Sequence, residues 1–260
     1  MKRLNTLFAL GASLLSCASA MAAEPLPQRW ISSGGSLSEW VVALGGESRL
    51  VGVDSTSQHP ESLRALPSIG YQRQLAAEGM LTLRPDMLIG SEEMGPPPVL
   101  AQLRGAGVLV EMLSSKADLS SLQASLQRIG TLLGEPQRAD QAFAAYQQRL
   151  QQQADWLVTA QRQQAAPGVL LLLGYAGGSP MAGGKDTSAD WLIERAGGRN
   201  LASHSGFKAL STEALLALDP EVVIIADRAS KAGMVAKVMD EVRAGGIKDV
   251  AIAADTAGGG

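Results

Sequence analysis

In the first third of the chain, one side chain could bind a metal ion and a second could support it. The run Gly70-Tyr71-Gln72-Arg73 places a phenol two residues before a guanidinium. A phenolate oxygen is a hard anionic donor that suits ferric iron, and tyrosine is a known axial ligand of haem iron. A bound metal or a nearby guanidinium favours the phenolate, so Arg73 could support Tyr71 as a ligand or pair with a haem propionate. The alternative is a tyrosine packed at the edge of a lobe with its hydroxyl hydrogen-bonded.

The segment that carries this pair occurs twice in the chain. The shared positions include a glutamate pair and a proline pair, each 135 residues apart: Glu78 and Glu213, Pro85 and Pro220. Each copy then enters a short apolar run of the kind that forms a strand. The two copies differ most in chemistry where Tyr71 of the first copy corresponds to Phe207 of the second.

A repeat of this size predicts two similar α/β lobes with a cleft between them. Strand-like and helical segments alternate, which is typical of mostly parallel sheets flanked by helices. Strands are expected at residues 30–32, 50–53, 87–90, 108–112, 169–173 and 222–225, and helices at 36–44, 77–83 and 187–196. Ser36 is expected to cap the first of these helices. We expect an N-terminal lobe at residues 27–134, a bridging helix at 135–166 and a C-terminal lobe at 167–260.

The bridging helix is expected from residues 137–164, which contain no glycine or proline. As one helix they would be roughly 42 Å long at 1.5 Å per residue. The segment is too polar for burial on all sides, so we expect it to lie along the outside of both lobes. Phe143, Leu150 and Leu157 recur every seven residues, which leaves a coiled-coil partner helix as an alternative.

The N-terminus has the features of an export signal. Lys2 and Arg3 precede an apolar stretch at residues 4–15, and a series of small residues follows. This pattern predicts a secretory signal peptide over residues 1–22. The chain's one cysteine, Cys17, lies in this segment within a sequence that resembles a lipoprotein cleavage box, so lipid anchoring is the alternative.

Composition argues against several other functions. Charged residues make up 18% of the chain and the net charge is −3, so no basic surface for nucleic acid is expected. Zinc and manganese sites need several converging ligands, but the chain has two histidines, His59 and His204, each in a polar loop expected to face solvent. No dinucleotide, Walker or zinc-protease motif is present, so no enzymatic activity is expected.

A longer pattern surrounds the Tyr71 motif. It comprises Pro67-Ser68-Ile69-Gly70-Tyr71-Gln72-Arg73, Leu75, Glu78-Gly79, Leu83 and Pro85-Asp86, and later residues 177–184, 196–200 and the second Glu-Pro segment. This pattern resembles periplasmic haem-binding proteins of bacterial ABC haem importers, and the resemblance covers roughly residues 30–226. The Glu and Pro-Asp elements are shared by the wider group of binding proteins whose lobes are joined by one helix. The Gly-Tyr-x-Arg motif is the part that points to haem.

The resemblance implies that haem is a transported ligand held in the cleft, with Tyr71 as its iron ligand and Arg73 beside that tyrosine. Tyr175 and His204 are further candidates for contact with the macrocycle. Met181 and Phe207 could pack on the porphyrin face, and packing in the core or in a loop is the alternative for both.

The resemblance also implies a docking role for Glu78 and Glu213. In this group such glutamates meet arginines on the two membrane subunits of the ABC importer. The alternative is that each glutamate simply interacts favourably with the start of its helix. The resemblance implies a periplasmic location, and we expect a monomer.

The end of the chain departs from this pattern after Asp227. Residues 228–256 resemble the C-terminal end of ExbD/TolR-type proteins and predict a helix at 234–244 and a strand at 250–253. A Ton-system accessory protein is therefore an alternative of another class. A siderophore or corrinoid receptor of the same architecture is a second alternative, and it would hold its ligand with several basic or aromatic groups.

Overall fold

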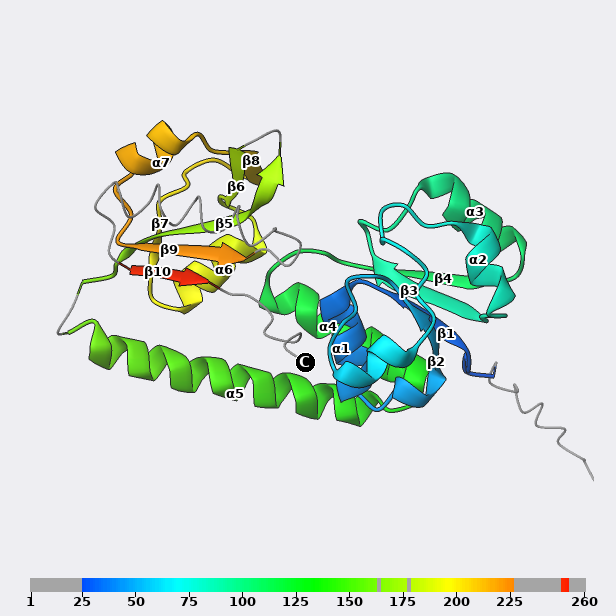
Figure 1. Cartoon of the computed structure of the whole chain (residues 1–260). Helices are drawn as coiled ribbons and strands as arrows, with labels where there is room; N and C mark the ends of the chain where they lie inside the picture. The colour runs from blue at the N-terminus through cyan, green and yellow to red at the C-terminus, as the bar shows by residue number, and fades with distance from the viewer. Residues whose placement is uncertain (1–24, 163–164, 177–178, 227–248, 253–260) are drawn as a thin grey trace, which may run out of the picture.

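The computed structural model describes residues 25–162, 165–176, 179–226 and 249–252. Its strands form two separate sheets, and one long helix runs past both (Figure 1). We call the N-terminal sheet with its helices the first lobe, and the C-terminal sheet with its helices the second lobe. The predicted α/β fold with mostly parallel sheets is confirmed.

The first lobe is a four-stranded parallel sheet with helices on both faces. In sheet order its strands are β2 (Leu50–Val53), β1 (Trp30–Ser33), β3 (Met87–Ser91) and β4 (Leu109–Leu113). Its helices are α1 (Gly35–Ala43), α2 (Ala77–Thr82), α3 (Pro97–Gly105) and α4 (Leu119–Leu133), with short 3-10 turns at Glu47–Arg49 and Glu61–Ala65. The predicted spans of the four strands, α1 and α2 each agree with these bounds to within one residue at either end.

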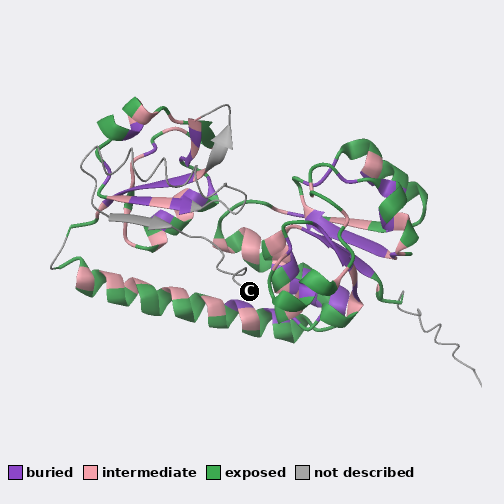
Figure 2. Ribbon diagram, in the orientation of Figure 1, coloured by how far each residue is buried: buried purple, intermediate pink, exposed green. Residues whose placement is uncertain are grey.

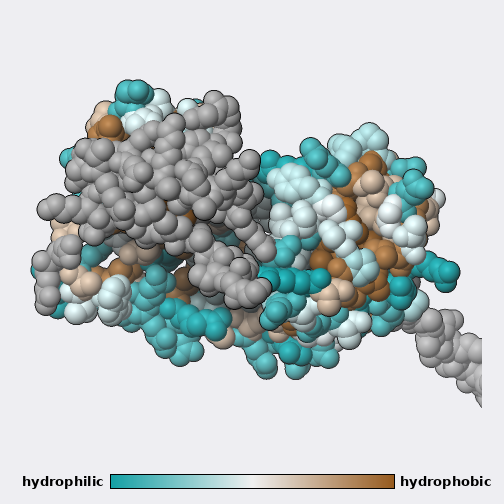
Figure 3. All heavy atoms as spheres, viewed as in Figure 1, coloured by the Kyte–Doolittle hydropathy of each residue, from teal (hydrophilic) through white to brown (hydrophobic). Residues whose placement is uncertain are grey.

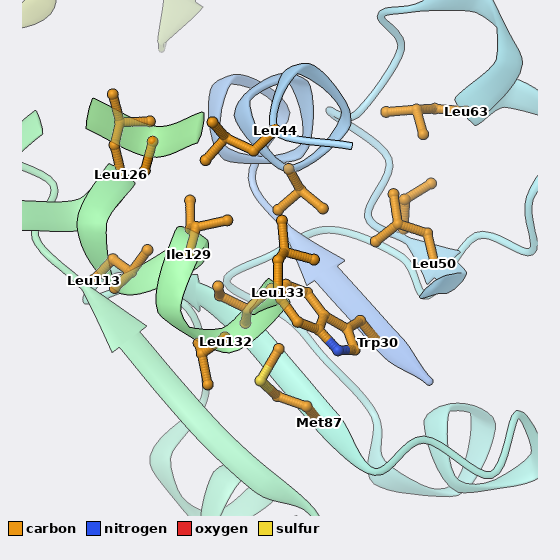
Figure 4. Close-up of a cluster of buried hydrophobic side chains, with 14 of the residues drawn as sticks. Trp30, Leu44, Leu50, Leu63, Met87, Leu113, Leu126, Ile129, Leu132 and Leu133 are labelled. Atoms are coloured by element: carbon orange, nitrogen blue, oxygen red, sulfur yellow. The ribbon is translucent and has the colours of Figure 1, made fainter. Parts of the chain in front are cut away.

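Alternation along the strands explains why this sheet is buried on both faces. Trp30 and Met87 pack with side chains of α1 and α4 in one cluster (Figure 4). Their sequence neighbours Ile31 and Leu88 pack with side chains of α2 and α3 on the opposite face. Successive side chains of a strand point to opposite faces, so apolar runs in β1 and β3 supply both cores, and Figure 2 shows these strands as buried.

The second lobe contains a six-stranded sheet of mixed direction. Its strands in order are β10 (Asp249–Ile252), β9 (Val222–Ala226), β5 (Gly168–Ala176), β6 (Ser179–Gly183) and β8 (Phe207–Ala209), and β7 (Arg199–Asn200) pairs with β5. Its helices are α6 (Ser188–Arg195) and α7 (Thr212–Ala217). The strand predicted near the end of the chain is confirmed as β10, one residue earlier than expected. The helix predicted at 234–244 lies outside the described residues.

The long helix is α5 (Pro136–Ala160), which ends four residues earlier than predicted. Phe143 packs into the core of the first lobe, whereas Leu157 lies against Gly197 in the second. The side-chain amides of Gln153 and Gln161 donate to backbone carbonyls at the end of α6, at 2.9 and 3.0 Å. Two of the three heptad positions, Phe143 and Leu157, thus pack on this chain's own lobes, which argues against the coiled-coil alternative. Figure 3 shows hydrophilic side chains along the side where α5 runs.

The internal repeat is visible in the backbone. Helices α2 and α7 are each six residues long and begin 135 residues apart, and the five-residue strands β3 and β9 have the same offset. The residues before the two repeated prolines, Arg84 and Asp219, both have a positive φ, 49° and 45°. The two copies therefore share backbone conformation as well as sequence.

The carboxyl groups after the repeated prolines also have matching roles. Asp86 accepts hydrogen bonds from the backbone N–H groups of Gln28 and Arg29, at 2.6 and 2.9 Å. Glu221 accepts one from the N–H of Gly168 at 2.8 Å. Asp86 therefore joins the start of β3 to the start of β1, and Glu221 joins the start of β9 to the start of β5. This structural role explains why the Pro-Asp and Pro-Glu elements are part of the fold and are not specific to one ligand.

A buried carboxyl group joins the loops that follow β1 and β2. Asp54 is 1% exposed, and its two oxygens accept four hydrogen bonds of 2.6–3.2 Å. The donors are the amide of Gly34, the amide and hydroxyl of Thr56, and the hydroxyl of Ser57. A buried carboxyl group without such donors would cost several kcal/mol, so these loops close around Asp54.

This network replaces the predicted cap of α1. Ser36 is not the cap, and the residue before the helix, Gly34, has no side chain to donate or accept. The Gly34 amide bonds to Asp54 and the Gly35 amide bonds to the hydroxyl of Thr56, at 2.9 and 3.0 Å. The prediction failed because the capping groups come from a loop about 20 residues away in sequence.

Asp54→Ala should lower the free energy of unfolding by roughly 2–4 kcal/mol, because buried donors would lose their acceptor. Asp140→Ala removes an exposed carboxyl group of α5, which accepts from the side-chain amide of Gln127 at 3.2 Å, and should change stability by less than about 1 kcal/mol. Urea unfolding followed by circular dichroism measures both values. Equal stability of the two variants would contradict the role given to Asp54.

Candidate functional site

Tyr71 stands at the carboxyl end of the parallel strands of the first lobe. Residues 67–70 extend the edge of the sheet through two backbone hydrogen bonds with Val53, 2.9 and 3.0 Å long. The amide of Ser55, next to Asp54, donates to the carbonyl of Gly70 at 2.8 Å. Ligands of open parallel sheets bind outside the carboxyl ends of the strands, so Tyr71 is placed where a ligand would approach.

The side chain of Tyr71 is available to a ligand. It is 42% exposed, and its hydroxyl makes no hydrogen bond to the residues that the structure describes. Gly70 precedes it with a φ of 85°, and nothing lies within 4 Å of where a Cβ would be at that position. The alternative of a packed tyrosine with a hydrogen-bonded hydroxyl does not describe this side chain.

Arg73 has a partner that the sequence analysis did not identify. Its Nη2 lies 2.7 Å from the Oε2 of Glu93, and both side chains are about half exposed. The hydrogen bond to Glu93 and the charge of that group raise the pKa of Arg73, and the neighbouring Tyr71 acts in the same direction. A signal was present, because Glu93 follows β3 closely and the carboxyl ends of parallel strands share one edge.

Backbone contacts hold the Tyr71 loop against the loop that follows β3. The amide of Gly95 donates to the carbonyl of Gln72 at 2.9 Å, and the amide of Leu75 donates to the carbonyl of Gly95 at 2.8 Å. On the other side, a Cβ at Gly34 would lie 3.2 Å from the side-chain oxygen of Gln72. The loops after β1, β2 and β3 therefore meet around the segment that carries Tyr71 and Arg73.

The second-lobe candidates gather on neighbouring strands. Phe207 is 37% exposed on β8 and pairs with Gly183 of β6, and Met181 is half-buried on the same strand. Tyr175 belongs to β5, where its backbone pairs with Pro180 at the start of β6, and its side chain lies outside the described part. The fold thus brings three of the four candidates to the β5–β6–β8 side of the sheet.

The expectation that His204 faces solvent is wrong. Both of its ring nitrogens are buried, and neither has a hydrogen-bond partner among the described residues. Its carbonyl accepts from the amide of Lys185 at 2.7 Å, so the loop before β8 is held against the loop after β6. His59 is exposed, as expected.

Within each lobe the candidate residues lie close together, but in the described part of the chain no polar contact joins the candidates of the first lobe to those of the second. Among the described residues, no hydrogen bond or ion pair links Tyr71 or Arg73 to Met181, His204 or Phe207. The described residues also contain no cluster of three His, Cys, Asp or Glu side chains that could hold a metal ion.

Sequence reasoning also missed a cavity of about 190 Å³ between the lobes. Its aromatic lining comes from Trp40 of α1, Tyr146 of α5 and Trp191 of α6. The rings of Trp40 and Tyr146 meet edge to face at 5.8 Å, and burial raises the pKa of Tyr146. No motif connects aromatic residues so far apart in sequence, so no signal could have revealed this cavity.

Glu78 and Glu213 occupy equivalent exposed positions in the first turns of α2 and α7. Figure 1 shows both helices on the side of the molecule away from α5. Their surroundings are not identical. Hydrogen bonds from its own backbone N–H and from Ser211 lower the pKa of Glu213, while α2 begins after Ala76, which has no capping side chain.

Known proteins resemble this chain over most of its length. A family model described as periplasmic binding protein matches residues 31–250. The structure of a periplasmic haem-binding protein from Pseudomonas aeruginosa is 61% identical, with a TM-score of 0.80, over 85% of this chain and 79% of that one. A periplasmic haem-binding protein from Vibrio cholerae is 34% identical, with a TM-score of 0.74, over 86% and 89%. The vitamin B12-binding protein of Pectobacterium atrosepticum is 27% identical over 223 residues, which are 84% of this chain and 77% of that protein.

Gly184→Ala should disturb the second-lobe part of the site, because a Cβ there would overlap the backbone carbonyl of His204. We expect a loss of about 1–3 kcal/mol in the free energy of unfolding, measured in urea. Gly79→Ala is the matched control, since nothing lies within 4 Å of its Cβ position in α2. That control should be neutral or stabilising by up to about 1 kcal/mol. A Gly184→Ala protein as stable as the control would show that these two loops are not packed this closely.

Proposed function

The chain belongs to the periplasmic binding protein family, and we propose that it captures haem between its two lobes and delivers it to an ABC importer. One observation carries the proposal. The exposed phenol of Tyr71 lies at the carboxyl edge of the sheet, where ligands of such folds bind, and this chain is 61% identical to a periplasmic haem-binding protein.

In this proposal Tyr71 binds ferric iron through its phenolate, since both partners are hard. The exposure of Tyr71 and its lack of a hydrogen-bond partner among the described residues support this role. Phe207 and Met181 would pack on the apolar porphyrin face from the second lobe, with Tyr175 and His204 beside them. Arg73 would lie next to the phenolate, close enough to influence its charge.

A corrinoid receptor is the second candidate, because a vitamin B12-binding protein is 27% identical to this chain. Haem is favoured by the much higher identity, 61%, to a haem-binding protein. The Ton-system alternative loses its support, since the family match continues to residue 250 and β10 joins the sheet of the second lobe. A siderophore receptor finds no support among the relatives described above.

We place the protein in the periplasm, as the family description indicates, with residues 1–22 as a cleaved leader. The leader and Cys17 lie outside the described residues. None of the described helices is long and apolar enough to cross a membrane. We propose a monomeric binding protein without catalytic activity, with lobes at residues 27–134 and 167–260 and a bridging segment at 135–166.

We further propose that Glu78 and Glu213 dock the protein onto the two membrane subunits of the importer. Their equivalent positions in α2 and α7 support this, because two related lobes would present one glutamate each to two related subunits. Both helices lie on the side away from α5 (Figure 1), so one face of the molecule could meet both subunits together.

Tyr71→Phe should abolish the ferric tyrosinate absorbance of the hemin-loaded protein and lower hemin affinity by more than about 100-fold. Arg73→Ala should weaken binding by roughly tenfold, because it removes a supporting group and not the metal bond. Absorbance titration with hemin measures both. Tyr146→Phe is the control: it removes a phenol from the cavity lined by Trp40 and Trp191, and the variant should bind hemin as the wild type does. Unchanged hemin binding by Tyr71→Phe would overturn the ligand assignment.

The double variant Glu78→Ala, Glu213→Ala should bind hemin normally and yet transfer it poorly to the importer. Removing the partner of a desolvated arginine costs roughly 2–5 kcal/mol, so the double variant should be worse than either single one. Haem uptake by the reconstituted importer at saturating binding protein is the measurement. Glu39→Ala, at another exposed glutamate, is the control. Normal haem uptake by the double variant would contradict the docking role and leave Glu78 and Glu213 as glutamates that only stabilise the start of their helices.

A further inference from the structure

Glu93 is the charged group closest to the Tyr71–Arg73 pair that the proposed function does not use. Its carboxylate lies 2.7 Å from the guanidinium of Arg73. The two loops that carry these side chains are fixed to each other by the backbone hydrogen bonds at Gly95, 2.8 and 2.9 Å long. The ion pair is therefore part of the surroundings of Tyr71 and not a chance contact between two mobile ends.

We propose that Glu93 is a specificity-determining residue that strengthens the preference of the site for ferric over ferrous haem. The inference rests on the proposed function, in which Tyr71 binds the iron. In addition, the negative charge of Glu93 neutralises the positive charge of Arg73, so that the site keeps the negative charge of the phenolate next to the metal.

The charges of the three side chains give the direction of this effect. A phenolate at Tyr71 carries one negative charge, Arg73 carries one positive charge, and Glu93 carries one negative charge. With all three present the group has a net charge of −1, which matches the +1 of an iron(III) porphyrin core. An iron(II) porphyrin core is neutral, so it gains less from this group. Without Glu93, Arg73 would cancel the phenolate and the preference would weaken.

Because the Arg73–Glu93 pair is exposed, changing either residue should not disturb folding. The side chains of Arg73 and Glu93 are 54% and 43% exposed, and an exposed ion pair contributes little to folding. Glu93→Gln keeps a side-chain oxygen that can accept from Arg73 and removes the charge alone. Glu92→Gln removes the neighbouring charge, whose nearest partner is the hydroxyl of Ser115 at 3.5 Å, and serves as the matched control.

The experiment measures the reduction midpoint potential of the full-length protein loaded with hemin, by spectroelectrochemistry. Glu93→Gln should raise the midpoint, which corresponds to a roughly two- to fourfold fall in the ratio of ferric to ferrous affinity. Arg73→Ala should lower the midpoint. The double variant should return close to the wild-type value, and Glu93→Asp and Glu92→Gln should leave it unchanged.

Three results would overturn the inference. They are an unchanged midpoint in Glu93→Gln, an equal shift in Glu92→Gln, and a double variant that shows the Glu93→Gln shift in full. The last would mean that Glu93 acts without Arg73. Failure of the proposed function has a different signature, because Tyr71→Phe would then bind hemin with the wild-type spectrum whatever the behaviour of Glu93 variants.

Discussion

Asp54 holds a carboxyl group out of contact with water at the point where the loops after β1 and β2 meet. Burial of such a group is tolerable when donors surround it, and here they come from both loops. The same closure fixes Ser55, which bonds to Gly70 and so sets where the chain turns into Tyr71. The position of Tyr71 at the edge of the first lobe's sheet therefore depends on the burial of Asp54.

The two copies of the internal repeat have similar backbones but place different side chains, Tyr71 and Phe207, at the equivalent position. Features that secure the fold are kept in both copies, such as the carboxyl groups of Asp86 and Glu221 at the entry to a central strand. The aromatic position after the glycine is also kept, and both side chains are exposed. What differs is a single oxygen, present in Tyr71 and absent from Phe207. In the proposed function, Tyr71 therefore supplies a bond to iron, whereas Phe207 supplies apolar packing.

Much of the fold was predictable because it is encoded locally. Apolar runs, helix ends and the repeated Pro-Asp and Pro-Glu elements predicted the four strands of the first lobe, β9, β10, α1, α2 and α6 to within one residue at either end, and β5 and α5 to within four. The short strands β6, β7 and β8 and the helix α4 were not predicted, and the other misses involve groups that meet across the chain. The cap of α1 comes from Thr56 and Asp54, Arg73 pairs with Glu93, and the ring of His204 is buried against the loop at Gly184. Such encounters depend on how loops fold over one another, and a one-dimensional pattern does not contain that information.

The aromatic cavity between the lobes has a practical consequence. Two of the chain's four tryptophans, Trp40 and Trp191, line it from opposite lobes. Indole emission depends on polarity and on nearby aromatic rings, so a change in the spacing of the lobes alters the light that these two residues emit. Trp30 is fully buried in the first lobe and Trp156 is 67% exposed on α5, so both keep their surroundings during such a movement. Trp40 and Trp191 would thus report any change in the spacing of the lobes without an added dye.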